Sequence, residues 1–185
     1  LTADEASFME PLSCVLHGLN KLNTQRAETA FIAGAGPIGI LILQVLTSRD
    51  LQCTVGEISE FRRKLASESG AQTTLDTTES FDKAKADGSG FDIVVDATGI
   101  PHVMEQIINL GSCGCDILLF GVPPKNSEIR IDPFTVFEKG LSIYGSYTSV
   151  ENSREAITAL SSGELEAKKL ISHRISLQQF EQGVE

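Results

Sequence analysis

Short apolar runs alternate with longer helical patterns through the middle of the chain. Six runs are rich in β-branched or aromatic residues and predict β-strands. They are residues 29–33, 53–55, 73–75, 93–95, 117–120 and 141–144. Helical patterns occupy residues 37–48, 59–69, 79–86, 101–110 and 134–138. Because the strands are apolar on both faces, the alternation predicts an α/β fold with a doubly wound parallel sheet of about six strands.

The helical segment at residues 37–48 has almost no polar face. We expect it to lie deep, with the sheet on one side and other protein on the other. The alternating unit fills residues 27–148. Residues 1–26 hold one helical pattern, and residues 149–185 hold two. Neither flank closes a domain by itself, so we expect both flanks to be pieces of a further domain.

The composition narrows the classes of partner. The chain has 185 residues, and its 25 acidic side chains outnumber 15 basic ones, which gives a net charge of −10. Such a surface repels phosphate backbones, which argues against nucleic acid or an anionic membrane as a partner. The longest apolar stretch, residues 31–46, is short and interrupted by glycines, so no membrane span is expected. Four cysteines in a chain of this length indicate a reducing, cytoplasmic setting.

A glycine-rich loop joins the first predicted strand to the apolar helix. Gly34, Gly36 and Gly39 form a G-x-G-x-x-G pattern, with Pro37 and Ile38 at the start of the helix. The first glycine permits a tight turn, the second lets a pyrophosphate approach, and the third allows close packing of helix and strand. The N-terminus of the helix adds unpaired N–H groups and a positive dipole end. This context predicts a Rossmann-type dinucleotide site.

An acidic residue follows the second predicted strand. Glu57 lies 18 residues after Gly39, where a carboxylate can accept hydrogen bonds from the adenosine ribose and repel a 2′-phosphate. Arg62 and Arg63 favour the opposite preference, because an arginine can hold that phosphate. The two arginines lie a turn into the next helix, so the sequence favours NAD over NADP.

Five segments together resemble the zinc-dependent medium-chain alcohol and polyol dehydrogenases, in the branch of sorbitol, arabinitol and threonine dehydrogenases. They are residues 10–18, 34–39, 96–99, 119–124 and 170–174. The resemblance implies a catalytic domain, then an NAD-binding domain, then a return segment. It places the zinc ligands before Leu1, so zinc is expected in the complete enzyme and not in this chain. The substrate implied is a small alcohol or polyol.

The resemblance also assigns roles to single residues. Glu10 resembles the family's glutamate beside the zinc, which touches the substrate, and is the one catalytic candidate. Arg62 resembles the basic residue that flanks the adenine. The nicotinamide end is implied for Thr98, Gly99, Gly121 and Val122.

Other assignments of these residues stay open. Glu10, Cys14 and His17 share one helix face and could bind a metal, although an interface helix with a buried thiol is favoured. Cys113 and Cys115 are two apart and would share a strand face. Asp96 is favoured as a loop organiser. His102 and His173 are interpreted as structural or surface residues.

Other classes of function are also open. They are a zinc-free quinone reductase of the same superfamily, a non-catalytic nucleotide-binding module and a methyltransferase.

Residues 128–132 alternate polar and apolar side chains between two prolines. This pattern predicts a short edge strand, and an unpaired apolar edge invites a partner. The resemblance implies subunits that pair at this edge. We therefore expect a homodimer or homotetramer in which Ile129 and Ile131 lie near a two-fold axis.

Overall fold

The computed structural model describes residues 1–78, 80–85, 88, 90–163 and 165–184. Its single sheet has six parallel strands in the order β3-β2-β1-β4-β5-β6. The strands are β1 (Thr29–Ala33), β2 (Gln52–Gly56), β3 (Thr73–Leu75), β4 (Phe91–Asp96), β5 (Gly111–Leu119) and β6 (Ser142–Gly145). This order reverses between β1 and β4, as in the doubly wound Rossmann fold, which confirms the predicted fold class.

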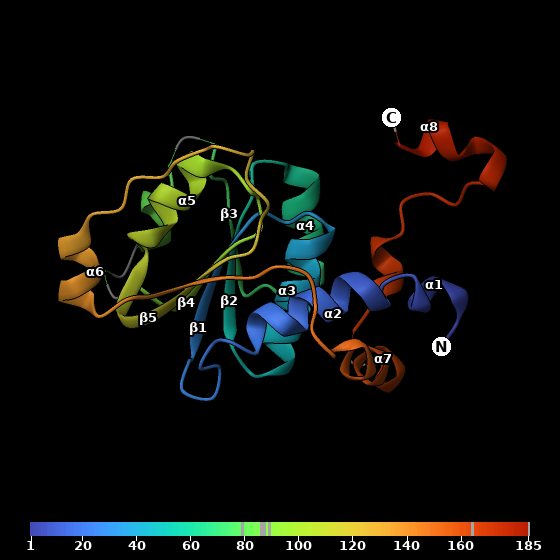
Figure 1. The fold of residues 1–185 in the computed structure, drawn as a ribbon, viewed down its shortest axis with the longest axis horizontal. Helices are drawn as coiled ribbons and strands as arrows, with labels where there is room; N and C mark the ends of the chain where they lie inside the picture. The colour runs from blue at the N-terminus through green and yellow to red at the C-terminus, as the bar shows by residue number, and fades with distance from the viewer. Residues whose placement is uncertain (79, 86–87, 89, 164, 185) are drawn as a thin grey trace.

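Helices cover both faces of the sheet (Figure 1). One side carries α2 (Met9–Leu19), α3 (Pro37–Ser48), α4 (Glu60–Glu68) and α7 (Ser153–Ser162). The other side carries α5 (Pro101–Ile108), α6 (Pro133–Lys139) and the 3-10 helix η1 (Asp82–Lys85). The short remaining helices are α1 (Ala3–Ala6), η2 (Ala167–Leu170), η3 (Leu177–Gln179) and α8 (Phe180–Val184). Of the predicted helix 79–86, positions 79 and 86 lie outside the described residues.

The core is divided by the sheet into two apolar clusters. Alternate residues of β1 point to opposite clusters: Ile32 packs toward α3, and Phe31 packs toward α5. Phe31 also contacts the rings of Phe81 and Phe91, with centroids 5.9 and 5.3 Å away. Because both faces bury apolar side chains, the central strands read as continuous apolar runs in the sequence.

Helix α3 lies as deep as its sequence predicts. Ile40, Leu41, Ile42 and Leu43 are fully buried, because the sheet covers one side of the helix and α2 covers another. Its polar Gln44 is buried too, and its Oε1 accepts the backbone N–H of Glu166 at 3.0 Å. Because α3 is packed in the apolar core, its first turn, where the glycine loop ends, has a fixed position.

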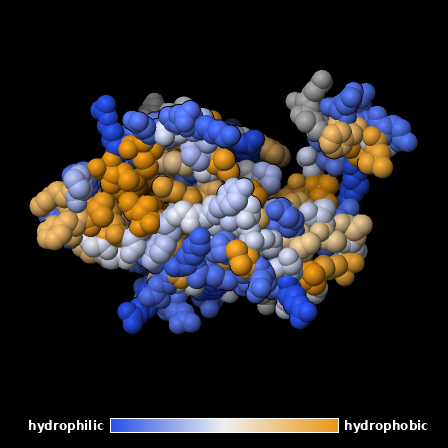
Figure 2. Space-filling model, in the orientation of Figure 1, coloured by the Kyte–Doolittle hydropathy of each residue, from blue (hydrophilic) through white to orange (hydrophobic). Residues whose placement is uncertain are grey.

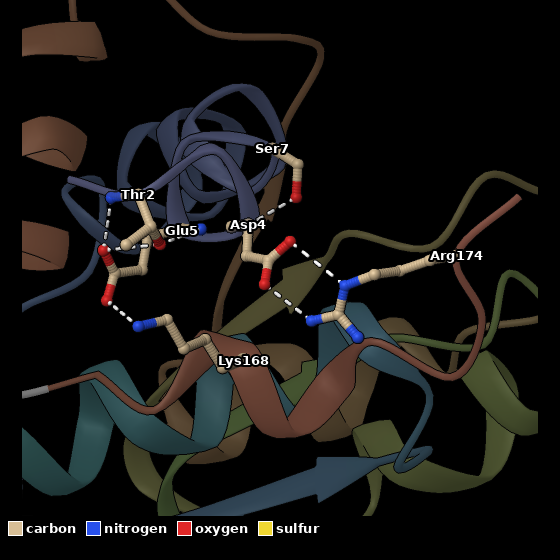
Figure 3. A network of polar contacts seen from close by, with 6 residues as sticks. All are labelled: Thr2, Asp4, Glu5, Ser7, Lys168 and Arg174. Carbon is tan, nitrogen blue, oxygen red and sulfur yellow. Dashed lines mark hydrogen bonds and ion pairs between the residues drawn. The ribbon is translucent and has the colours of Figure 1, made fainter. Parts of the chain in front are cut away.

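Two ion pairs join the ends of the chain (Figure 3). Asp4 pairs with Arg174 at 2.6 Å, and Glu5 pairs with Lys168 at 2.7 Å. The hydrogen bond from Lys168 and those from Thr2 lower the pKa of Glu5 to about 2. The basic partners of both pairs are at least half exposed. Residues 175–183, which follow the pairs, are exposed, at the upper right of Figure 1.

The prediction of an edge strand at residues 128–132 is wrong for the single chain, because this segment is irregular. The backbone N–H of Arg130 donates to Oε1 of Glu105 at 2.8 Å, which ties the segment to α5. Ile129 and Ile131 are half-buried against the core under α5, so they do not form an outward apolar face. Phe134 and Phe137 of α6 are exposed instead. Apolar surface is visible at the α6 end of the molecule in Figure 2.

The prediction that Cys113 and Cys115 share a strand face is also wrong. Cys113 is exposed and Cys115 is buried. Gly114 between them has a φ of +78°, and the pairing register of β4 with β5 shifts at this point, so the strict alternation of side chains is lost. Burial, followed by the charge of Asp116, raises the pKa of the Cys115 thiol to about 12.

None of the helices in the described ranges has the length and apolar composition that a membrane span requires.

Candidate nucleotide-binding site

The glycine loop crosses from the end of β1 to the start of α3. Gly34 has a φ of +98°, which L-residues with a side chain rarely adopt, so a glycine is needed for the turn. Its backbone N–H donates to the carbonyl of Gly56 at the end of β2, at 2.8 Å. The turn is thus bonded to the neighbouring strand.

Gly36 and Gly39 meet different surroundings. A Cβ atom on Gly39 would collide with the carbonyl oxygen of Gly34, so only a glycine lets the first turn of α3 pack on the loop. A Cβ atom on Gly36 would find nothing within 4 Å. Gly36 caps the helix, and Pro37 occupies its first position, where a missing N–H costs nothing. Gly34 and Gly39 thus have the turn and packing roles that the motif predicts, and the space beside Gly36 is open.

Glu57 lies directly after β2 and is only 6% exposed. Its Oε2 accepts the backbone N–H of Ala35 inside the glycine loop at 2.8 Å, and its Oε1 accepts the N–H of Ser59 at 2.9 Å. A buried carboxylate is stable only with such partners. The carboxylate therefore braces the glycine loop against the start of α4, a role that the sequence did not reveal.

The two arginines of α4 have different surroundings. Arg62 is exposed and lines a cleft beside the glycine loop. Arg63 is half-buried, and its Nη1 donates to the carbonyl oxygens of Glu57 and Ile58 at 2.9 and 2.7 Å. Its Nη2 lies 3.2 Å from Oδ2 of Asp76. Arg63 is thus engaged by the protein itself.

Asp96 organises the loop after β4, as predicted. It is fully buried, and its Oδ1 accepts the N–H and the hydroxyl of Thr98 at 3.0 and 2.6 Å. Its Oδ2 accepts the N–H of Gly99 at 3.1 Å. A Cβ atom on Gly121 would overlap the backbone of Gly99, so the loops after β4 and β5 touch at two glycines.

A cleft of about 530 Å³ opens at the carboxyl ends of β1, β2 and β4. It brings together five of the residues predicted for the cofactor, namely Gly34, Gly36, Glu57, Arg62 and Thr98. Pro37, Ile38, Gly39, Gly99, Gly121 and Val122 lie outside its lining. Val122 is 91% exposed in the next loop.

Several residues of the cleft were not predicted. Thr77, Thr78 and Phe81 follow β3, and His102 and Gln106 lie on the first turns of α5. His102, interpreted as a structural or surface residue, is exposed but lines the cleft. Their signal in the sequence was positional: each follows the carboxyl end of a parallel strand, where ligands bind in open α/β sheets.

Glu10 lies outside the cleft lining, exposed at the start of α2. Its Oε1 accepts the thiol of Cys14 at 3.3 Å. Burial, followed by this carboxylate, raises the pKa of Cys14, so the thiolate that a metal needs is disfavoured. Across the described residues, no group of three or more His, Cys, Asp or Glu side chains could hold a metal ion.

These features define the class of the chain as a Rossmann-type α/β domain. A family model described as zinc-binding dehydrogenase matches residues 37–162, and the chain belongs to this family. It is 35% identical over 181 residues to D-altritol 5-dehydrogenase of Agrobacterium fabrum, with 95% of this chain and 53% of the relative covered. It is 27% identical over 193 residues to D-arabinitol dehydrogenase 1 of Uromyces fabae, with 100% of this chain and 55% of the relative covered.

Solved structures agree with this assignment. A protein of Sinorhizobium meliloti 1021, described as a zinc-binding dehydrogenase bound to NADP, superposes with a TM-score of 0.91 at 27% identity, covering 96% of this chain and 54% of its own. A protein of E. coli CFT073, described as a short chain alcohol dehydrogenase complexed with NADH, superposes with a TM-score of 0.87 at 25% identity. The match covers 96% of this chain and 53% of that protein. The chain thus spans about half the length of these relatives.

Alanine at Gly39 and at Gly36 is expected to act differently on stability. Gly39→Ala should lower the free energy of unfolding by about 2 kcal/mol, because the new Cβ displaces the Gly34 carbonyl and overpacking typically costs about 1–3 kcal/mol. Gly36→Ala, with open space around it, should change it by less than about 0.5 kcal/mol. Urea denaturation of both variants checks this, and equal losses would contradict the separate roles.

Proposed function

We propose that the chain is the NAD(H)-binding part of a zinc-dependent dehydrogenase that oxidises a polyol or a secondary alcohol. The observation that carries the proposal is the cleft in which Gly36, Glu57 and Thr98 meet at the switch point of the sheet. The names of the similar altritol and arabinitol dehydrogenases support the substrate class. A cytoplasmic location is part of the proposal, since the nucleotide pool that it needs is intracellular.

The surroundings of Gly36 fit a dinucleotide. The open space at its Cβ position and the N-terminus of α3 suit a pyrophosphate, with the N–H groups of Ile38 and Gly39 as donors. Glu57 would orient the adenosine ribose, and Arg62 would flank the adenine. Thr98, Gly99, Gly121 and Val122 would line the path toward the nicotinamide. When bound, NAD supplies the acceptor for a hydride.

The described residues do not fit a catalytic zinc, which needs three protein ligands and an open position. The proposal therefore assigns the zinc ligands to other parts of the parent enzyme. Glu10 is proposed to touch the substrate there, because its carboxylate is exposed on α2.

A preference for NAD over NADP is part of the proposal. The charge of Glu57 faces the cleft, and a 2′-phosphate beside it would be repelled. Arg63 is occupied by two carbonyl oxygens and Asp76, so Arg62 alone of these two arginines lines the cleft. In the cleft lining, the exposed Arg62 therefore favours NADP, and the buried Glu57 disfavours it.

Calorimetric titration with NADH and NADPH tests the cofactor. NADH should bind about tenfold or more tightly than NADPH, because the carboxylate of Glu57 would repel the 2′-phosphate. Two like charges ~4 Å apart repel by about 1 kcal/mol in bulk water and by about 4 kcal/mol near a protein surface. Gly36→Val should abolish binding, since its side chain fills the pyrophosphate path.

Gly145→Val is the matched control, because Gly145 also has open space around its Cβ position but lies outside the cleft. Tighter binding of NADPH would overturn the role of Glu57. Binding of neither nucleotide would overturn the proposed function.

We also propose a homodimer built at the α6 end of the molecule. Phe134 and Phe137 of α6 are 62% and 82% exposed and lie with ring centroids 6.4 Å apart, beside the loop at 128–132. An exposed aromatic pair of this kind is typical of an interface. A symmetric contact would bring two copies of α6 together.

Light scattering at micromolar concentration should give twice the mass of one chain. Phe137→Asp should reduce it to one chain without loss of NADH binding, since the side chain is already exposed. Phe61→Asp, which changes an equally exposed phenylalanine on α4, should leave the mass unchanged. A wild-type monomer, or a dimer that Phe137→Asp does not affect, would contradict this surface.

A further inference from the structure

Arg63 connects the two turns that form the ribose end of the cleft. From α4 it donates through Nη1 to the carbonyl oxygens of Glu57 and Ile58, at 2.9 and 2.7 Å, in the turn after β2. Through Nη2 it contacts Oδ2 of Asp76 at 3.2 Å, in the turn after β3. Its side chain is only 19% exposed. A guanidinium with its donors in a fixed fork suits such a junction better than a lysine ammonium.

Asp76 carries the connection into the cleft wall. Its Oδ1 accepts the hydroxyl and the backbone N–H of Thr78, at 2.5 and 3.0 Å. These bonds, and to a smaller extent the charge of Arg63, lower the pKa of Asp76, so it is charged at neutral pH. Thr77 and Thr78 both line the cleft. The Arg63–Asp76 pair therefore fixes the wall that faces Glu57.

Glu57 is held from both sides of its backbone. Its N–H donates to the carbonyl of Leu75 at 3.0 Å, and its own carbonyl accepts from Arg63. With the backbone fixed, the carboxylate reaches Ala35 and Ser59 and stays at the floor of the cleft. Arg63 is not among the residues that line the cleft, so it acts through Glu57 and not by contact.

We propose that Arg63 is a positioning residue for cofactor choice: it fixes Glu57 and the 76–78 turn so that the ribose end of the cleft accepts two hydroxyl groups and rejects a 2′-phosphate. This rests on the proposed function. It differs from the expectation that an arginine here holds the 2′-phosphate, because the guanidinium of Arg63 is engaged by the carbonyl oxygens of Glu57 and Ile58 and by Asp76.

The test measures the affinities of NADH and NADPH for Arg63→Met, Arg63→Lys and the wild type. Arg63→Met should weaken NADH binding about tenfold, since two charge-assisted hydrogen bonds are lost. It should change NADPH binding less than about threefold, because Glu57, with its backbone carbonyl released by Arg63, can shift its carboxylate away from the phosphate. The NADH preference should therefore fall about threefold or more, and Arg63→Lys should lie in between.

Lys64→Met is the matched control, because Lys64 is an exposed neighbour on the same helix and pairs only loosely with Glu68, at 4.0 Å. It should leave both affinities unchanged. Asp76→Asn provides a second variant at a half-exposed side chain, in case Arg63→Met does not fold. It should also lower the NADH preference.

Three results would overturn the proposal. Equal weakening of both nucleotides would show a merely structural role. A larger loss for NADPH would make Arg63 a phosphate ligand. An unchanged preference in Arg63→Met, or in Asp76→Asn where that variant is used, would show that Glu57 needs no positioning. A wild type that binds neither nucleotide refutes the proposed function itself, which separates the two failures.

Discussion

The candidate site depends on one buried carboxylate. Glu57 is almost fully buried, and burying a carboxylate costs free energy unless it is hydrogen-bonded. Its two oxygens offset this cost by accepting hydrogen bonds from the backbone N–H groups of Ala35 and Ser59. Ala35 lies in the glycine loop and Ser59 is the N-cap of α4, so one side chain joins the starts of two helices. The loop is thereby shaped before any ligand arrives, which is the preorganisation that tight binding requires.

Close backbone packing supplies the rest of the site. Gly39 lets α3 touch the turn at Gly34, and Gly121 lets the loop after β5 touch Gly99. In the loop after β4, the carboxylate of Asp96 accepts hydrogen bonds from the N–H and hydroxyl of Thr98 and from the N–H of Gly99. Since the underlying strands and α3 are buried in the two apolar clusters, the loops cannot shift without disturbing the core. The part of the cleft that these loops form is thus anchored to the core.

The sequence predicted the parts that depend on local periodicity. The six strands, the apolar α3 and the glycine loop follow from apolar runs and from motif spacing, and residues 29–33 and 37–48 match the observed bounds. It failed where tertiary contacts decide. Residues 128–132 alternate like a strand, but the single chain ties them to Glu105. Cys113 and Cys115 separate because Gly114 breaks the alternation. The separate surroundings of Arg62 and Arg63 depend on Asp76, whose nearness no spacing reveals.

Amide hydrogen exchange of Glu57→Met, without nucleotide, tests the bracing role of Glu57 most directly. Methionine fills a similar volume but offers no carboxylate oxygen. Exchange at Ala35 and Ser59 should accelerate about tenfold or more, because both N–H groups lose their acceptor. Exchange at Gly34, whose N–H is bonded to the Gly56 carbonyl, should change far less. Unchanged protection at Ala35 and Ser59 would contradict the account, because the glycine loop would then hold its shape without Glu57.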